Sequence, residues 1–166
     1  MPPLSTDALV RALRVPSGLV LDFYVTFGRF EYALKAAGFV HHPRGVAEAD
    51  WHSFVTFLEQ LEPAARLPVV EAGQQLIAEP PKKLVLDGTD PPWKPVPRGR
   101  QSNIRFLLEG VKRARNNLFH GGKWVPNPER PERNGVVVTA ALDVLHALLE
   151  VPGVIRLRQA YDELAP

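Results

Sequence analysis

The chain has no cysteine, which excludes disulfide bonds and thiolate metal sites and is compatible with a cytoplasmic protein. It also has no run of eighteen apolar residues, so we expect no membrane-spanning helix. The N-terminal stretch lacks a basic segment followed by an apolar core, and we expect no signal peptide. The formal net charge is only +2, which is too small to indicate nucleic-acid binding by itself. These absences predict a cytoplasmic protein without membrane contact.

What the chain does contain is enough for one globular domain. Its 166 residues, 45% of them hydrophobic, can bury a single core, and we expect one domain over 1–166. The 17 prolines are about twice the usual share. Because they gather in 80–97 and 126–131, they predict loops in those places rather than disorder throughout.

Apolar periodicity predicts an all-α bundle of about five main helices. The expected helical segments are 4–14, 19–37, 48–61, 63–78, 102–120 and 134–150, with a last turn or short helix reaching Leu164. The strand-like run Lys83–Leu86 is too short to anchor a sheet, and 80–99 is expected to be a turn-rich loop. Trp93 in this loop either stacks on a base or holds the loop against the core.

One arginine lies where the clearest helix pattern places its buried face. On a wheel of about 100° per residue, the apolar positions of 102–120 and Arg115 fall within roughly 50° of one line. Those apolar positions are Ile104, Leu107, Leu108, Val111 and Leu118. A guanidinium is costly to desolvate unless it is paired or faces a wet cavity. Arg115 is therefore either a functional side chain or a helix-end arginine that interacts with the macrodipole.

A glutamate interrupts the apolar face of the other long helix, 19–37. Glu31 lies one turn from Phe27 and from Leu34. Because a buried charge needs a partner, the sequence predicts that 19–37 and 102–120 pack together and that Glu31 pairs with Arg115 or lies close to it. The alternative is a Glu31 side chain that reaches solvent at the edge of the apolar face.

Polar side chains gather toward the C-terminal end of 102–120. Asn116 and His120 are four residues apart and share one face, and Gly121–Gly122 predicts a helix stop after them. Histidine titrates near neutral pH and can transfer protons. The candidate phosphate contacts are Arg105, Lys112 and Lys123, with Arg130 and Arg133 in the loop that follows. The alternative for these cations is an ordinary solvated face.

Three further histidines, His41, His42 and His52, do not predict a metal site. Adjacent histidines point in different directions, and no carboxylate lies at ligand spacing beside them on a helix. We therefore expect neither a metal nor a cofactor.

Two patches of the sequence resemble one family. Arg115-Asn116-Asn117-Leu118-Phe119-His120-Gly121 is similar to the Arg-x(4–6)-His signature of HEPN domains, which lies at the end of a long helix and is usually followed by glycine. The stretch 30–39 resembles the first core helix of many HEPN proteins. The resemblance extends over about 18–158, although only these two patches are specific.

The resemblance implies metal-independent RNA cleavage by a homodimer in which two motifs form one composite site, often in a toxin or an antiviral effector. In this chemistry the RNA 2′-hydroxyl attacks the adjacent phosphodiester. His120 would move the proton, Arg115 would stabilise the phosphorane charge and Asn116 would orient His120 or bind phosphate. Glu31 would hold Arg115.

One position departs from the pattern of HEPN toxins that are silenced by a nucleotidyltransferase. Such toxins often carry a tyrosine two residues after the motif histidine, where this chain has Gly122. A cognate antitoxin is therefore expected to be nucleotidyltransferase-like or of another kind. The alternative function is a non-catalytic helical module that binds RNA or a partner protein. A DNA-binding regulator is less favoured, because no helix–turn–helix with a basic recognition helix is visible.

Overall fold

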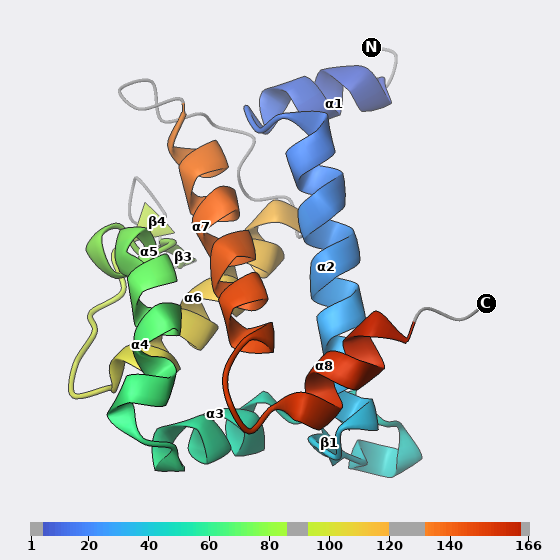
Figure 1. Ribbon diagram of the computed structural model, residues 1–166. Coiled ribbons are helices and arrows are strands. Elements are labelled where there is room, and N and C mark those ends of the chain that lie inside the picture. Colours follow the sequence, from blue (N-terminus) through green and yellow to red (C-terminus); the bar gives the residue numbers. More distant parts are fainter. Residues whose placement is uncertain (1–4, 86–92, 120–131, 164–166) are drawn as a thin grey trace.

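The computed structural model describes residues 5–85, 93–119 and 132–163, and these residues are mostly helical (Figure 1). The helices are α1 (Thr6–Ala12), α2 (Ser17–Ala36), α3 (Trp51–Gln60), α4 (Pro63–Ala72), α5 (Gln74–Ala78), α6 (Asn103–Phe119), α7 (Arg133–Leu149) and α8 (Ile155–Asp162). The 3-10 turn Pro43–Gly45 and two short hairpins complete the described elements. The predicted all-α bundle is confirmed. In the described part of the chain, no helix combines the length and the apolar character that crossing a membrane requires.

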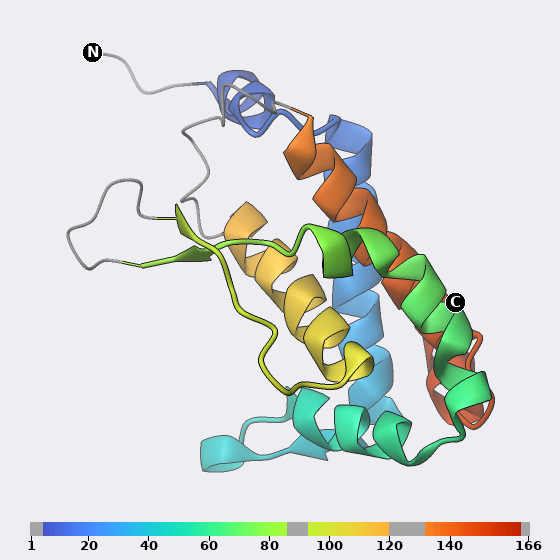
Figure 2. The ribbon, with the colours of Figure 1, turned by 90° about the vertical axis from the view of Figure 1, so that its left-hand side faces the viewer.

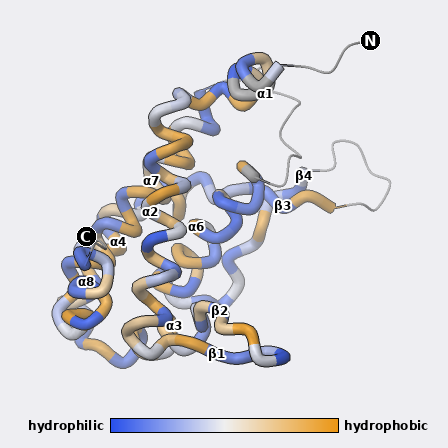
Figure 3. The backbone as a smooth tube through the Cα atoms, turned by 90° about the vertical axis from the view of Figure 1, so that its right-hand side faces the viewer, coloured by the Kyte–Doolittle hydropathy of each residue, from blue (hydrophilic) through white to orange (hydrophobic). Residues whose placement is uncertain are grey.

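Helix α7 lies at the centre of the bundle. It packs against α2 on one side and against α4, α5 and α6 on the other, while α8 returns to pack on α2 (Figure 1). Turned by 90°, the molecule shows α6 beside α2 and the β3–β4 hairpin projecting from the bundle (Figure 2). Apolar and polar stretches alternate along the helices, as expected for elements that bury one face (Figure 3).

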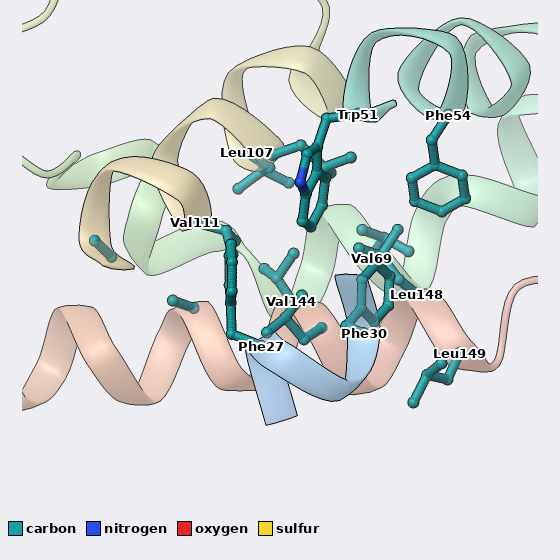
Figure 4. Close-up of a cluster of buried hydrophobic side chains, with 14 of the residues drawn as sticks. Phe27, Phe30, Trp51, Phe54, Val69, Leu107, Val111, Val144, Leu148 and Leu149 are labelled. Atoms are coloured by element: carbon teal, nitrogen blue, oxygen red, sulfur yellow. The ribbon is translucent and has the colours of Figure 1, made fainter. Parts of the chain in front are cut away.

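Aromatic side chains join α2 to α3 in the core. The Trp51 ring stacks on the rings of Phe27 and Phe30, each with a centroid separation of 5.6 Å, and Phe54 meets Phe30 edge to face (Figure 4). Asp50 begins α3, and its carboxylate accepts from the Ser53 backbone N–H. The N-cap therefore fixes the start of the helix that delivers Trp51 to this cluster.

The predicted helix 63–78 is divided at Gly73, where α4 ends and α5 begins. A Cβ added at Gly73 would lie 2.3 Å from Cδ2 of Leu107, a fully buried side chain of α6. Glycine is therefore required here for the close approach of α6. The apolar pattern runs through this position without a break, so the sequence did not reveal the division.

Two hairpins interrupt segments that the sequence predicts as loops or helix starts. Strand β1 (Val40–His41) pairs antiparallel with β2 (Glu48–Ala49), and β3 (Lys83–Leu84) pairs with β4 (Trp93–Lys94). Two-residue strands are too short to show the alternation by which strands are recognised. The β3–β4 pairing sets Leu84 opposite Trp93 within the predicted turn-rich loop.

The side of α2 turned away from Phe27 holds α8. Arg29 Nε donates to the Tyr161 carbonyl at 2.9 Å, and its Nη2 donates to the carbonyls of Ala160, at 3.0 Å, and Glu163. The last carbonyls of a helix have no partner within the helix. One guanidinium therefore both caps α8 and fastens it to α2.

Candidate functional site at the C-terminal end of α6

Helix α6 starts from an ion pair with α3. Ser102 Oγ accepts from the Arg105 backbone N–H and donates to Glu59, whose other carboxylate oxygen lies 2.7 Å from Arg105 Nη2. These hydrogen bonds lower the pKa of the Glu59 carboxyl. Arg105 was predicted to contact RNA phosphate near the motif, but it lies ten residues, or about 15 Å, from Arg115. Arg105 therefore lies apart from the motif at the other end of α6, and its ion pair with Glu59 joins α3 to α6.

Arg115 is partly buried at the other end of α6, directed toward α2. Its Cζ lies 5.6 Å from the centroid of the Phe27 ring, and its Nη1 donates to Asn116 Oδ1 at 3.1 Å. A cation at this distance from an aromatic face is stabilised by the ring quadrupole. The guanidinium on the apolar arc is thus accommodated partly by an aromatic face, and it holds the Asn116 amide beside it.

The two long helices predicted to pack together do so less extensively than expected. Helix α2 packs chiefly on α7 and α8, and α6 chiefly on α7, α3, α4 and α5. The Arg115–Phe27 contact is one interaction that joins the motif region of α6 to α2. Helix α7 is a main partner of both, because it lies between most of their lengths.

Of the two arrangements predicted for Glu31, an ion pair with Arg115 or a position close to it, the ion pair is corrected. Glu31 Oε1 accepts a hydrogen bond from Trp51 Nε1 at 3.0 Å, and the ion pairs within the described ranges do not include Glu31 with Arg115. Trp51 is buried, and a buried indole N–H needs an acceptor. Glu31 supplies that acceptor. Arg115 and Glu31 are nevertheless linked, since Phe27 contacts the guanidinium on one side and stacks on Trp51.

A cavity of about 480 Å³ lies between the β3–β4 hairpin and the outward face of α6. Its lining residues are Lys83, Leu84, Trp93, Glu109, Lys112, Arg113, Asn116 and Asn117. We call this space the hairpin cavity. It contains two of the predicted site residues, Lys112 and Asn116, and Lys112 Nζ lies 3.3 Å from Glu109. The structure thus brings Lys112 and Asn116 together on one face, with Arg115 hydrogen-bonded to the second.

Two lining residues were not singled out from the sequence. Asn117 is buried, and its Nδ2 donates to the Lys82 carbonyl at 2.8 Å, which holds the hairpin strand on α6. Arg113 carries a buried Nη1 that has no hydrogen-bond partner in the described structure, and burial lowers the pKa of its guanidinium. The signal available in the sequence was the dense run of polar residues 112–117, but the wheel places Arg113 opposite the apolar stripe, where solvent is expected.

Several predicted residues lie outside the described ranges or have other roles. His120, Lys123 and Arg130 fall in 120–131, which the structure does not describe. Arg133 donates to the Pro80 carbonyl at 2.9 Å and lies 3.8 Å from Glu79, so it joins the start of α7 to the end of α5. His41 faces Glu48 across the first hairpin at 3.4 Å, and in the described ranges no group of histidine and acidic side chains is arranged to hold a metal ion.

The arrangement at the end of α6 offers a fixed guanidinium, an amide beside it and cations along the adjacent face, which together suit an oxyanion such as a phosphate. Family models, curated proteins and solved structures were compared with the chain, and none of them matches it.

Proposed function

We propose that the protein is a metal-independent endoribonuclease of the HEPN type. The observation that carries the proposal is the placement of Arg115. Its guanidinium is held at the C-terminal end of α6 by the Phe27 ring and the Asn116 amide, five residues before His120 in the chain. A cation kept in one position there can meet the negative charge that develops on a phosphorane.

The proposed reaction uses residue types that the chain supplies. The RNA 2′-oxygen attacks the adjacent phosphorus, the bond from phosphorus to the 5′-oxygen breaks, and the products are a 2′,3′-cyclic phosphate and a 5′-hydroxyl. His120 accepts the proton of the 2′-hydroxyl, and the His120 of a second copy delivers a proton to the leaving 5′-oxygen. Arg115 stabilises the charge on the phosphoryl oxygens. Asn116 binds phosphate or orients His120.

The structure changes the role we propose for Glu31. Because Glu31 accepts from Trp51, it acts on the site through the Trp51 and Phe27 rings rather than by pairing with Arg115. It is therefore a positioning residue and not a catalytic one.

We propose that the enzyme is a cytoplasmic homodimer that acts as a toxin or antiviral effector and is restrained by a cognate antitoxin. An exposed apolar strip on α2 supports the dimer. It consists of Leu21, Tyr24, Val25 and Tyr32, whose exposed fractions lie between 53% and 61%. Contact between two such strips would join two copies along α2, the helix whose Phe27 ring contacts Arg115.

The test compares RNA cleavage by wild type and by His120→Ala and Arg115→Ala. The matched controls are His52→Ala, an exposed histidine on α3, and Arg158→Ala, an exposed arginine on α8. We expect each motif substitution to lower the cleavage rate by about 100-fold or more, with the helical circular dichroism unchanged and both controls active. Cleavage should persist in excess chelator and stop when the 2′-hydroxyl at the cut site is methylated.

Two results would contradict the proposal. One is robust cleavage by His120→Ala, and the other is activity that EDTA abolishes and magnesium restores. RNA binding without any cleavage by the wild type would favour the alternative of a non-catalytic binding module. Expression in a host cell separates the same possibilities, because a nuclease should inhibit growth and His120→Ala should not.

A further inference from the structure

The hairpin cavity combines an aromatic wall with a polar floor. Trp93, on β4, is partly buried and lines one side, while Lys112, Arg113 and Asn116 line the floor from α6. Its volume of about 480 Å³ falls in the range of pockets that hold small ligands, about 300–1,000 Å³. An indole face accepts the flat surface of a base by stacking. The cavity therefore offers an aromatic surface and hydrogen-bond donors at the same time.

The charge in the hairpin cavity favours an anion. Lys83, Lys112 and Arg113 are cationic, and Glu109 is the acidic residue among the lining side chains. Glu109 lies 3.3 Å from Lys112, and its charge also acts on Arg113, so three cations face one carboxylate in the cavity. Several cations around a partly enclosed space attract a negatively charged group.

Arg113 has hydrogen-bonding capacity that the described residues do not use. Its Nη1 is shielded from water and has no acceptor there, an arrangement that is unfavourable for a buried donor. Native proteins retain few such groups, and those that persist call for a functional or structural reason. The Arg113 side chain also lines the cavity, so a ligand oxygen there can accept from the part of the guanidinium that is not shielded. Phosphate oxygens suit it because they accept paired donors from the planar fork.

Asn116 connects the hairpin cavity to the candidate catalytic residue Arg115. Asn116 lines the cavity and also accepts the hydrogen bond from Arg115 Nη1 at 3.1 Å. A strand whose reacting phosphate lies at Arg115 would therefore pass the cavity with a neighbouring nucleotide.

We infer that the hairpin cavity is a subsite that binds one nucleotide of the RNA strand next to the cleaved bond, with its phosphate on Arg113 and Lys83 and its base stacked on Trp93. This inference rests on the proposed ribonuclease function and adds to it a recognition element carried by the β3–β4 hairpin. Arg113 and Trp93 bind the strand, and the chemistry remains with the motif.

The experiment measures binding of a fluorescent RNA of about 12 nucleotides, within the range of single-strand site sizes. Every 2′-hydroxyl of this probe is methylated, so that it cannot be cut. Wild type is compared with Trp93→Ala, Arg113→Met and the control Arg158→Met, an exposed arginine on α8. We expect each of the first two substitutions to weaken binding by about tenfold or more and the control to leave it unchanged. With cleavable RNA, KM should rise and kcat should persist.

The salt dependence separates the two roles. The slope of log affinity against log salt should become shallower by roughly 0.7 for Arg113→Met, because one phosphate contact on a single strand is lost. Trp93→Ala should keep the wild-type slope. Arg113→Met should also unfold at the same or a higher temperature, because it removes a buried donor that lacks an acceptor. A purely structural Arg113 would lower the unfolding temperature and leave the salt slope as it is, which would overturn the inference.

Binding and cleavage fail independently in this design. If wild type binds the probe through Trp93 and Arg113 but never cuts unmethylated RNA, the proposed function falls and the subsite stands. If wild type cuts RNA as proposed and both variants bind the probe like wild type, the subsite falls and the function stands. Adenosine monophosphate and inorganic phosphate serve as competitors. If the monophosphate binds as tightly as the probe, and both substitutions weaken it, the cavity takes a free nucleotide and the strand subsite is overturned.

Discussion

Arg115 and Phe27 form a cation–π contact that joins the end of α6 to α2, with Cζ 5.6 Å from the ring centroid. The ring is itself fixed, since it is buried and stacks on Trp51. The position of the guanidinium therefore depends on packing in the core beneath it.

This contact predicts different outcomes for two neighbouring phenylalanines. Phe27→Leu should reduce RNA cleavage about five- to tenfold, because the guanidinium loses the ring face. Phe23→Leu is the matched control, a buried phenylalanine one turn earlier on α2. Both should cost roughly 1–3 kcal/mol in urea unfolding, but Phe23→Leu should keep full activity at a temperature where it is folded. Equal activity loss in the two variants would contradict a specific role of the ring.

Glu31 should be replaceable by an uncharged acceptor. Glu31→Gln keeps a side-chain oxygen for the Trp51 indole, so we expect the free energy of unfolding to change little. Glu31→Ala leaves a buried N–H without an acceptor and should cost about 1–3 kcal/mol. Chemical unfolding followed by tryptophan fluorescence measures both. If the glutamine variant is as unstable as the alanine variant, and RNA cleavage is lost in both, the negative charge of Glu31 is needed.

The Glu59–Arg105 ion pair should make stability fall in acid. The pKa of Glu59 is lowered from its ordinary value of 4.5 by hydrogen bonds from Arg105 and Ser102. Because the folded pKa is the lower one, the stabilisation is complete above 4.5 and is lost as pH falls through the folded-state pKa. Between about pH 5 and 3, Glu59→Gln should therefore lose less stability than wild type. Glu62→Gln, an exposed neighbour, should follow the wild-type curve.

The apolar strip of α2 should carry the dimer contact. Val25→Asp should convert the proposed homodimer to a monomer in sedimentation equilibrium at roughly 10 µM, a concentration at which an interface of standard size holds. Val46→Asp is the control, since Val46 is 61% exposed, against 57% for Val25, but lies between β1 and β2, outside the apolar strip. If two motifs form one site, the loss of the dimer in Val25→Asp should also lower the rate of RNA cleavage. A wild type that is monomeric at this concentration would count against the assembly.

The long helices could be predicted from the sequence because each carries a periodic apolar face. The boundaries of α2, α3, α6 and α7 lie within three residues of the expected ones. Features that depend on a partner elsewhere in the chain could not be predicted. At Gly73, where α4 and α5 meet, the chain lies close to Leu107 of α6, which is far away in the sequence. The strands of the hairpins have two residues each, too few to show an alternating pattern.

At the candidate site, Arg115 was identified because a charge on an apolar arc needs a partner, but a charged partner was assumed. A hydrophobic pattern counts every phenylalanine as an apolar residue, so Phe27, which contacts a cation, could not be distinguished from an ordinary core residue. Arg113 was not predicted as a site residue, because the helical pattern places it on the polar face. The pattern assigns it to solvent, and only the hairpin formed by distant residues covers that side of α6.

The attachment of α8 by Arg29 has a kinetic consequence. Arg29 joins positions 131 to 134 residues apart, and we expect these hydrogen bonds to form after the core that α2 and α7 share has packed. A contact absent from the transition state affects the unfolding rate rather than the folding rate. Arg29→Met should therefore refold as fast as wild type and unfold faster in stopped-flow measurements. The lifetime of the native state, and not the speed of its formation, is what this side chain controls.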